Sequence, residues 1–220
     1  MKKDLIIVGS GGHGRGVLEI AEAMNDEKPV WNILGFLDEN PDKHGSTVCG
    51  YPVLGGCEFI QRHQAMVSVC IGSASTRRRV VHDLVSSGNV EFATLIHPMT
   101  ILSKRSEVAD GVVVFGGACI DTNTHIGRHV LIGRNATVGH DITIGDYANI
   151  FPSATLSGDT YVGEGSEIGS NATVIPGIHI KQWSTVGASA VVTSNLEANV
   201  TAVGMPAKVV KRREEGWHLL

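Results

Sequence analysis

The sequence predicts two domains of different class: a small α/β domain over residues 1–92 and an all-β parallel β-helix over residues 93–203, followed by a tail over residues 204–220. Three observations predict this division. The first part alternates strand-length apolar runs with amphipathic segments of helical length. The second part repeats an aliphatic residue every six positions. The composition agrees, because 27 glycines and only 5% aromatic residues suit a repetitive core of small aliphatic side chains.

The overall composition excludes several classes of function. The net charge is −4 and 18% of residues are charged, with no basic excess for nucleic acid or for anionic lipid. No apolar run approaches the roughly 18 residues of a membrane span. The apolar run after Lys2 and Lys3 is only four residues long, too short for a signal peptide. We therefore expect a cytoplasmic protein without membrane insertion and without a nucleic-acid partner.

The cysteines give no sign of a metal or redox site. Cys49, Cys57, Cys70 and Cys119 form no C-x-x-C pair. Free cysteines behave as small apolar residues and are among the residue types most often buried. We expect buried free thiols, and no metal requirement.

The N-terminal domain begins with a phosphate-binding pattern. Residues 5–8 read as a buried parallel strand, and residues 15–24 read as a helix with one apolar face. Between them, residues 9–14 have the spacing G-x-G-x-x-G. Backbone amides at the start of such a helix suit an anionic phosphate. The pattern predicts a Rossmann-like unit that holds a nucleotide.

Two further strands are expected, over residues 33–37 and 67–71, with a helix over residues 76–87. The first of these strands ends at Asp38 and Glu39, where a ribose or a base is usually bound. A dinucleotide-dependent oxidoreductase is therefore a rival interpretation. The domain is too short for the usual two-half dinucleotide fold, so a nucleotide diphosphate group fits better.

The second domain carries an uninterrupted period of six. All seventeen positions in one phase are Val, Ile or Leu: Ile96, Leu102, Val108, Val114, Ile120, Ile126, Ile132, Val138, Ile144, Ile150, Leu156, Val162, Ile168, Val174, Ile180, Val186 and Val192. A helix repeats near 3.6 residues and a strand near 2, so the period fits a short strand plus a tight corner. Three repeats make one triangular coil, and one aliphatic side chain per repeat points inward. Coils then stack about 4.8 Å apart.

Glycine and small residues occupy other phases of the repeat. The position after the aliphatic residue is often glycine, as at Gly127, Gly133, Gly139, Gly145, Gly163, Gly169 and Gly187. Because glycine reaches positive φ at low cost, we expect these glycines to form the corners. The position four after the aliphatic residue is small or β-branched, as at Ala136, Ala154 and Ala172.

This pattern, aliphatic-Gly-x-x-small-x, resembles that of the hexapeptide-repeat acyltransferases over residues 93–210. The likeness includes the ending Val203-Gly204-Met205-Pro206-Ala207-Lys208. It implies a left-handed β-helix, usually trimeric, with active sites between neighbouring subunits. The alternative is a β-helix without catalysis, either a scaffold or a protein like the γ-type carbonic anhydrase. The latter needs three metal-binding histidines, and His125, His129, His140 and His179 lack an obvious spacing for it.

The combination of both domains is similar to the bacterial sugar acetyltransferases of cell-surface glycan synthesis. These include N-acetyltransferases of UDP-, GDP- or dTDP-linked 4-amino-sugars and sialic acid O-acetyltransferases. The resemblance implies that the N-terminal domain binds the substrate through Gly11, Gly12 and His13 at the diphosphate, Asp38 and Glu39 at the base or ribose, and Gly72, Ser73 and Arg77 at the rest of the nucleotide sugar. For Arg77 the alternative is a solvated helix residue beside Arg78 and Arg79.

The candidate catalytic pair is His140 and Asp141, which match the general base of the family and its acidic neighbour. An amine that attacks a thioester must lose a proton, and an imidazole can accept it at neutral pH. A nearby carboxylate can orient the ring. Neighbouring side chains on a strand point to opposite faces, so contact between these two residues requires a corner. His125 and His129 are expected to be solvent-facing or structural.

The resemblance also implies an acetyl-CoA site. Repeat phase matches Asn149, Ser170 and Ala188 to contacts with the pantetheine and acetyl group, and Lys208 to a CoA phosphate. Many amino-sugar members carry His where this chain has Asn149, and Asn where it has Gly133.

Three functions follow from these patterns. The first is acetyl-CoA-dependent N-acetylation of a nucleotide-linked amino-sugar of the 4-amino-4,6-dideoxy type. The second is O-acetylation of sialic acid or another sugar. The third is a non-catalytic nucleotide-binding scaffold. Either transferase is expected to be a homotrimer.

Overall fold

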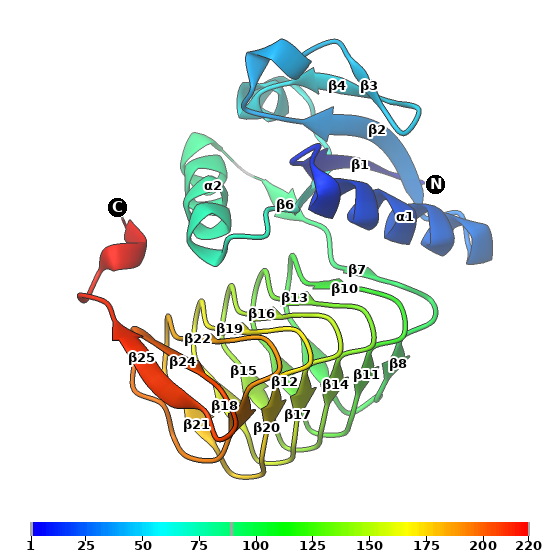
Figure 1. The fold of residues 1–220 in the computed structure, drawn as a ribbon. Coiled ribbons are helices and arrows are strands. Elements are labelled where there is room, and N and C mark those ends of the chain that lie inside the picture. Colours follow the sequence, from blue (N-terminus) through cyan, green and yellow to red (C-terminus); the bar gives the residue numbers. More distant parts are fainter. Residues whose placement is uncertain (1, 89, 220) are drawn as a thin grey trace. The chain divides into compact units, whose positions relative to one another are not determined.

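The computed structural model describes residues 2–88 and 90–219, and the chain divides into two compact units, Met1–Pro98 and Met99–Leu220 (Figure 1). The first unit is α/β and the second is all-β. Each unit has its own core. The two classes are those that the sequence predicts.

The first unit is built on a mostly parallel sheet with strand order β3-β4-β2-β1-β5-β6. Among the described strands of this sheet, only β3 and β4 pair antiparallel. The elements are β1 (Lys3–Val8), α1 (Gly12–Glu27), β2 (Trp31–Leu37), η1 (Pro41–Lys43), β3 (Thr47–Val48), β4 (Tyr51–Gly55), η2 (Cys57–Arg62), β5 (Met66–Val69), α2 (Ala74–Ser87), β6 (Glu91–Phe92) and β7 (Leu95–Ile96). Within the described residues, no helix is long and apolar enough to cross a membrane.

The buried strand β1 lies at the centre of this sheet. Leu5, Ile6 and Ile7 are fully buried, and β1 pairs with β2 on one side and β5 on the other. The segments that follow β1 thus add strands to both of its edges, β2 to one and β5 to the other. The carboxyl ends of β1 and β5 therefore form a topological switch point. Ligands of open α/β sheets bind in the crevice at such a point. The glycine-rich turn follows β1, and Gly72 and Ser73 follow β5.

The second unit is a left-handed β-helix with three faces (Figure 1). Face 1 holds β10 (Val113–Val114), β13 (Leu131–Ile132), β16 (Asn149–Ile150), β19 (Glu167–Ile168), β22 (Thr185–Val186) and β24 (Val200–Val203), with β25 (Lys208–Arg212) antiparallel at its edge. Face 2 holds β8 (Ile101–Leu102), β11 (Cys119–Ile120), β14 (Thr137–Val138), β17 (Thr155–Leu156), β20 (Thr173–Val174) and β23 (Val191–Val192). Face 3 holds β9 (Glu107–Val108), β12 (His125–Ile126), β15 (Thr143–Ile144), β18 (Tyr161–Val162) and β21 (His179–Ile180).

The register confirms the predicted coil of three repeats. Val138 pairs with Ile120 in the coil before it and with Leu156 in the coil after it, so each strand lies on the strand three repeats away. From Val114 to Val192 every aliphatic residue of the phase is buried. Leu102 and Val108 are half-buried, because β8 and β9 are the edge strands of their sheets.

The corners correct one prediction from the sequence. The left-handed φ lies three residues after the inward aliphatic residue, for example at His129 (φ 56°), Asn135 (φ 57°) and Asp141 (φ 58°), and not at the phased glycines. Those glycines are needed for close stacking instead. A Cβ on Gly145 would lie 2.6 Å from the backbone nitrogen of Glu164 in the next coil. The expectation that these glycines supply the positive φ is therefore wrong.

The C-terminal segment packs on a corner of the β-helix. The His218 ring stacks on Trp183, with 3.8 Å between ring centroids. The indole nitrogen of Trp217 donates to Asn199 Oδ1 at 3.1 Å, and a short helical turn, η3 (Trp217–Leu219), carries both rings.

All four cysteines are free thiols. Only Cys70 is buried, Cys57 and Cys119 are half-buried, and Cys49 is exposed. The expectation that all four are buried is wrong for three of them.

Candidate active site

His140 and Asp141 lie at the corner between faces 2 and 3, after β14 and before β15. Asp141 has φ 58°, and this left-handed turn breaks the alternation of side chains along a strand. The two neighbouring side chains can therefore face each other. The imidazole Nδ1 of His140 lies 2.8 Å from Oδ2 of Asp141, and both side chains are about half exposed.

Asp141 has a further partner that the sequence reading did not single out. The amide nitrogen of Asn123 donates to Asp141 Oδ1 at 3.1 Å. Asn123 occupies the same corner one coil earlier and shares the left-handed φ of Asp141. Both carboxylate oxygens of Asp141 are thus engaged. Reading the sequence at intervals of one whole coil would have found this pair.

The electrostatics of the pair favour an ionised Asp141 carboxylate and a more basic His140 imidazole. The hydrogen bond to Asp141 raises the pKa of His140 above its ordinary value, with smaller contributions from the nearby carboxylates of Asp159 and Asp121. The pKa of Asp141 is lowered, first by its hydrogen bond to His140 and then by that from Asn123. Asp141 therefore stays ionised at neutral pH while His140 gains basicity.

The contact with Asp141 also sets the tautomer of His140. A carboxylate can only accept hydrogen bonds, so we assign the proton of the neutral ring to Nδ1. The lone pair then lies on Nε2. This arrangement lets His140 accept a proton from a bound nucleophile, while Asp141 stabilises the imidazolium that forms.

The residues expected to bind acetyl-CoA lie elsewhere on the β-helix. Ser170 and Ala188 are at the corner between faces 1 and 2, and Lys208 is exposed on β25. Asn149 lies on face 1, where it is 2% exposed and donates from Nδ2 to Glu167 Oε1 at 3.1 Å. Within one chain, these residues do not share a corner with His140.

The glycine-rich turn has the geometry of an anion site. Gly9 has φ +99°, and a Cβ on Gly14 would overlap the carbonyl oxygen of Gly9. Gly11 and Gly12 have open space where a side chain would stand. Helix α1 begins here with no side-chain cap and no acidic residue in its first turn, so its positive end faces this space.

His13 and the segment after β5 come together at this switch point. A Cβ on Gly72 would lie 3.3 Å from the His13 ring, so the ring packs against Gly72. Burial and the nearby Arg77 guanidinium lower the pKa of His13, which favours a neutral ring. Ser73 caps α2, accepting from the Thr76 backbone nitrogen at 3.3 Å.

Arg77 is fully buried, so the alternative of a solvated helix residue is wrong. Its guanidinium donates to the carbonyl oxygen of Ile71 at 2.6 Å and to that of Gly72 at 3.5 Å. Arg77 thus holds the turn against which His13 packs.

Asp38 connects the glycine-rich turn to the segment after β2. Its Oδ2 accepts from the Ser10 hydroxyl and backbone nitrogen, and from Lys43 Nζ at 2.8 Å. Partial burial raises the pKa of the Asp38 carboxyl, but the hydrogen bonds from Lys43 and Ser10 outweigh it and hold the pKa far below its ordinary value. Glu39 accepts from the backbone nitrogen of Cys57 at 3.3 Å.

The other histidines of the β-helix are not brought together with His140. His125 is exposed and pairs with Glu107 at 3.0 Å, whereas His129 is 3% exposed and stacks on Tyr147. Within residues 2–88 and 90–219, no group of three or more His, Cys, Asp or Glu side chains is arranged to hold a metal ion.

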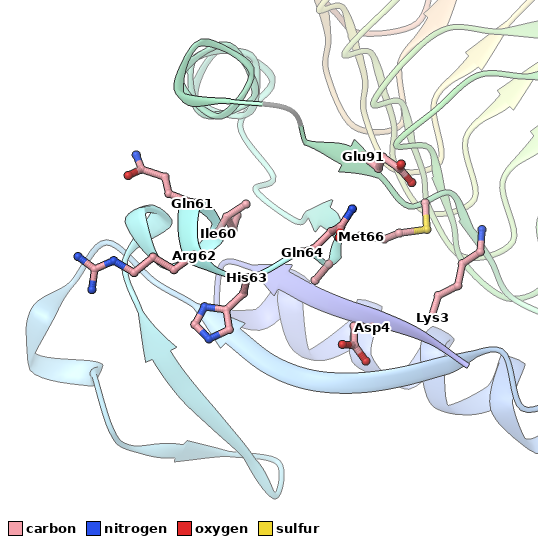
Figure 2. A pocket seen from close by; sticks show the side chains of 10 residues that line it. Lys3, Asp4, Ile60, Gln61, Arg62, His63, Gln64, Met66 and Glu91 are labelled. Carbon is pink, nitrogen blue, oxygen red and sulfur yellow. The ribbon is translucent and has the colours of Figure 1, made fainter. Parts of the chain in front are cut away.

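A hollow of about 590 Å³ lies at the amino ends of the strands in the first unit (Figure 2). It is lined by the starts of β1, β5 and β6 and by residues 60–65, away from the glycine-rich turn. Figure 2 shows Lys3 and Arg62 pointing away from one another rather than toward a common point. This mixed lining gives no indication of a particular ligand.

Comparisons with known proteins match both units. Residues 4–84 match the family described as PglD N-terminal domain. Residues 123–158 match bacterial transferase hexapeptide (six repeats), and residues 160–194 match the hexapeptide repeat of succinyl-transferase. The second unit thus carries hexapeptide repeats of the kind found in bacterial transferases.

Two N-acetyltransferases resemble part of the chain in sequence. The chain is 35% identical over 118 residues to UDP-N-acetylbacillosamine N-acetyltransferase of Bacillus subtilis and 30% identical over 149 residues to GDP-perosamine N-acetyltransferase of Escherichia coli. These matches span 51% and 66% of each chain compared, so the chain covers about half to two thirds of these relatives.

A solved structure extends the likeness to nearly the whole chain. It is a perosamine N-acetyltransferase from Caulobacter crescentus, with one histidine replaced by asparagine, in complex with CoA and GDP-perosamine. The TM-score is 0.87 at 29% identity, and the match covers 94% of this chain and 97% of the other.

Proposed function

We propose that this acyltransferase moves the acetyl group of acetyl-CoA to the amine of a nucleotide-linked amino-sugar of the 4-amino-4,6-dideoxy type, for cell-surface glycan synthesis. His140 is the general base. The observation that carries the proposal is the contact of His140 Nδ1 with Asp141, which leaves Nε2 as the proton acceptor.

The proposed reaction is a direct transfer. The neutral amine of the sugar attacks the acetyl carbonyl carbon, and Nε2 of His140 takes the proton that the nitrogen loses. The carbon–sulfur bond then breaks, and CoA leaves as a thiolate that takes the proton back from the His140 imidazolium. Asp141 stabilises the positive imidazolium between these two events. No acyl-enzyme intermediate is required when both substrates are held together.

The first unit supports a nucleotide diphosphate as the handle of the substrate. The open start of α1 and the neutral His13 ring lie at the switch point, where backbone amides and a ring N–H donate to phosphate oxygens. The hydrogen bonds from Ser10 and Lys43 fix the orientation of the Asp38 carboxylate, which can then accept a hydrogen bond from a ribose or a base. The N-acetyltransferases that this chain resembles are named for UDP- and GDP-linked amino-sugars.

The position of the acetyl-CoA residues supports an active site between subunits. His140 is at one corner of the coil, and Ser170 and Ala188 are at another. A neighbouring copy in a cyclic homotrimer can bring its second corner to the His140 corner of the first. Lys208, exposed on β25, then supplies a positive charge for a phosphate of CoA.

Acetyl transfer measured with acetyl-CoA and a panel of UDP-, GDP- and dTDP-linked 4-amino-sugars tests the proposal. Because general-base catalysis contributes about 10²–10⁴-fold, His140→Asn should lose about that factor in kcat. The variant should still bind CoA, as seen by its thermal stabilisation, because a ligand of the folded state raises stability. Full activity of His140→Asn would refute the assigned base.

The same panel separates the other two functions. Acetylation of a sugar hydroxyl, with no binding of nucleotide sugars, would indicate an O-acetyltransferase. Binding of a nucleotide sugar without any stabilisation by acetyl-CoA would indicate a scaffold.

A further inference from the structure

The ring of His140 is seated on a glycine of the next coil. Gly158 occupies the same corner as His140, one coil later. A Cβ on Gly158 would lie 2.5 Å from Cε1, 2.6 Å from Nε2 and 3.1 Å from Nδ1 of His140. The first two distances are shorter than real Cβ contacts, so the ring in its present orientation requires that position 158 have no side chain.

The fold of the backbone does not itself require a glycine at position 158. Gly158 does not have a left-handed φ, and the nearest atoms to the missing Cβ all belong to the His140 ring. The phased glycines differ, because a Cβ at Gly145 or Gly133 would strike the backbone of the next coil. The absent side chain of Gly158 therefore affects the His140 ring and not the stacking of coils.

The carboxylate that holds the ring is itself held from the opposite side. Asn123, one coil before, donates to Asp141 Oδ1, while Asp141 Oδ2 contacts the ring. Asp141 is about half exposed, so without Asn123 its carboxylate can rotate into solvent. Asn123 and Gly158 thus confine the dyad from the coils on either side of it.

We propose that Asn123 and Gly158 are positioning residues, which fix the imidazole of His140 so that Nδ1 stays on Asp141 and Nε2 faces the acceptor amine. The proposal rests on the proposed function for its catalytic consequence. Its structural part, the orientation of the ring, can be measured without any substrate.

A titration of His140 tests the structural part. The pKa of His140 is read from the imidazole shifts of ¹³C-labelled histidine, with the signal assigned by its loss in His140→Asn. Asn123→Gly keeps the left-handed φ and removes the donor, since glycine adopts that conformation freely. In this variant and in Gly158→Ala, the pKa of His140 should fall toward its ordinary value of about 6.5. Asn135→Gly, at another corner with the same φ, should leave it unchanged.

The kinetic part predicts a specific pattern. Both Asn123→Gly and Gly158→Ala should lower kcat by about 10-fold or more, because the base is less well placed, with little change in KM for either substrate. The acid limb of the pH profile should move to lower pH in parallel with the pKa of His140. A role in folding alone would lower stability and leave the pH profile in place.

A comparison of Gly158→Ala in the wild-type and His140→Ala backgrounds separates an effect on the His140 ring from an effect on the stability of the fold. Gly158→Ala should shift Tm by less than about 2 °C, because only a flexible ring must move. In the His140→Ala background it should have no effect at all, because the clash has been removed. The proposal is overturned if the pKa of His140 stays unchanged in both variants, or if Asn135→Gly lowers it equally. Absence of acetyl transfer by the wild-type protein, with the pKa shifts present, would instead reject only the proposed function.

Discussion

At the scale of single residues, the proposed chemistry depends on the carboxylate of Asp141 beside the imidazole of His140. Asp141 raises the pKa of His140, and a general base acts only when it is unprotonated. We expect kcat/KM to rise with pH through a pKa above about 6.5.

Replacing Asp141 by Asn should shift that dependence. The amide has no charge to stabilise the imidazolium, so the pKa of His140 falls and the acid limb moves to lower pH. The plateau should drop by about 10–100-fold, because the base becomes weaker and less well oriented. A pH profile measured with the wild type in parallel checks this, and an acid limb that stays in place would contradict the assigned dyad.

Asp38 should make the stability of the first unit depend on pH. Its pKa is lowered in the folded state, so it stabilises the fold above its unfolded pKa of about 3.9, and this contribution is lost as pH falls through the folded pKa. Asp38→Asn should cost about 2 kcal/mol of unfolding free energy at pH 7, because hydrogen bonds to a charged group are lost. The difference from wild type should shrink below about pH 4.

Urea unfolding at pH 7 and pH 3 measures this difference. Asp42→Asn is the matched control, since Asp42 is exposed nearby in η1 and should change little at either pH. If Asp38→Asn lowers the unfolding free energy equally at both pH values, the loss of stability would come from the altered shape of the side chain and not from its charge.

The residues of the site were predictable to different extents. His140 and Asp141 stand together in the sequence, so a reading along the chain finds them. Asn123 and Gly158 act from the coils before and after that of His140, and a period of six does not single them out. For Arg77 the sequence left two interpretations open, a substrate-binding residue and a solvated helix residue beside Arg78 and Arg79. The structure excludes the second, because Arg77 is fully buried and its guanidinium donates to backbone carbonyl oxygens of the loop after β5.

At the scale of elements, glycines in two phases of the repeat have different physical roles. Gly145 has a backbone neighbour where its Cβ would stand, whereas Gly177 has a left-handed φ of +73° and open space around it. Gly145→Ala should therefore cost about 3 kcal/mol through overpacking against rigid backbone. Gly177→Ala should cost only about 1–2 kcal/mol, the strain of a left-handed L-residue.

Equilibrium unfolding of both variants in denaturant checks this order. A larger cost at Gly177 would contradict the explanation of the phased glycines by close stacking. The sequence could not place the left-handed positions, because Asn, Asp, His, Ser, Tyr and Trp all occupy them and no residue type marks the phase. The period of six did predict the faces and the register, because a single inward side chain per repeat fixes both.

The short strands of the first unit were harder to predict for a related reason. β3 and β6 have two residues each and carry no periodicity, and β4 contains Pro52, which disfavours a strand in a sequence reading. Their pairing depends on the neighbouring strands β2 and β5. By contrast, β1 is a continuous apolar run between a charged start and a glycine-rich turn, and such a run predicts a buried parallel strand.

At the scale of the whole molecule, the proposed active site requires more than one copy of the chain. His140 lies at the corner between faces 2 and 3, and Ala188 at the corner between faces 1 and 2. In a cyclic trimer, each site would combine the first corner of one subunit with the second corner of its neighbour.

Mixed trimers test this arrangement directly. His140→Ala removes the base, and Ala188→Trp obstructs the corner expected to bind acetyl-CoA, so each variant alone should be inactive. When both are co-expressed in equal amounts, about a quarter of the sites should pair an intact His140 corner with an intact Ala188 corner, and about a quarter of wild-type activity should return. A site formed within one chain would give no recovery, because every chain would carry one defect. Mixing the two purified trimers without subunit exchange is the control and should remain inactive.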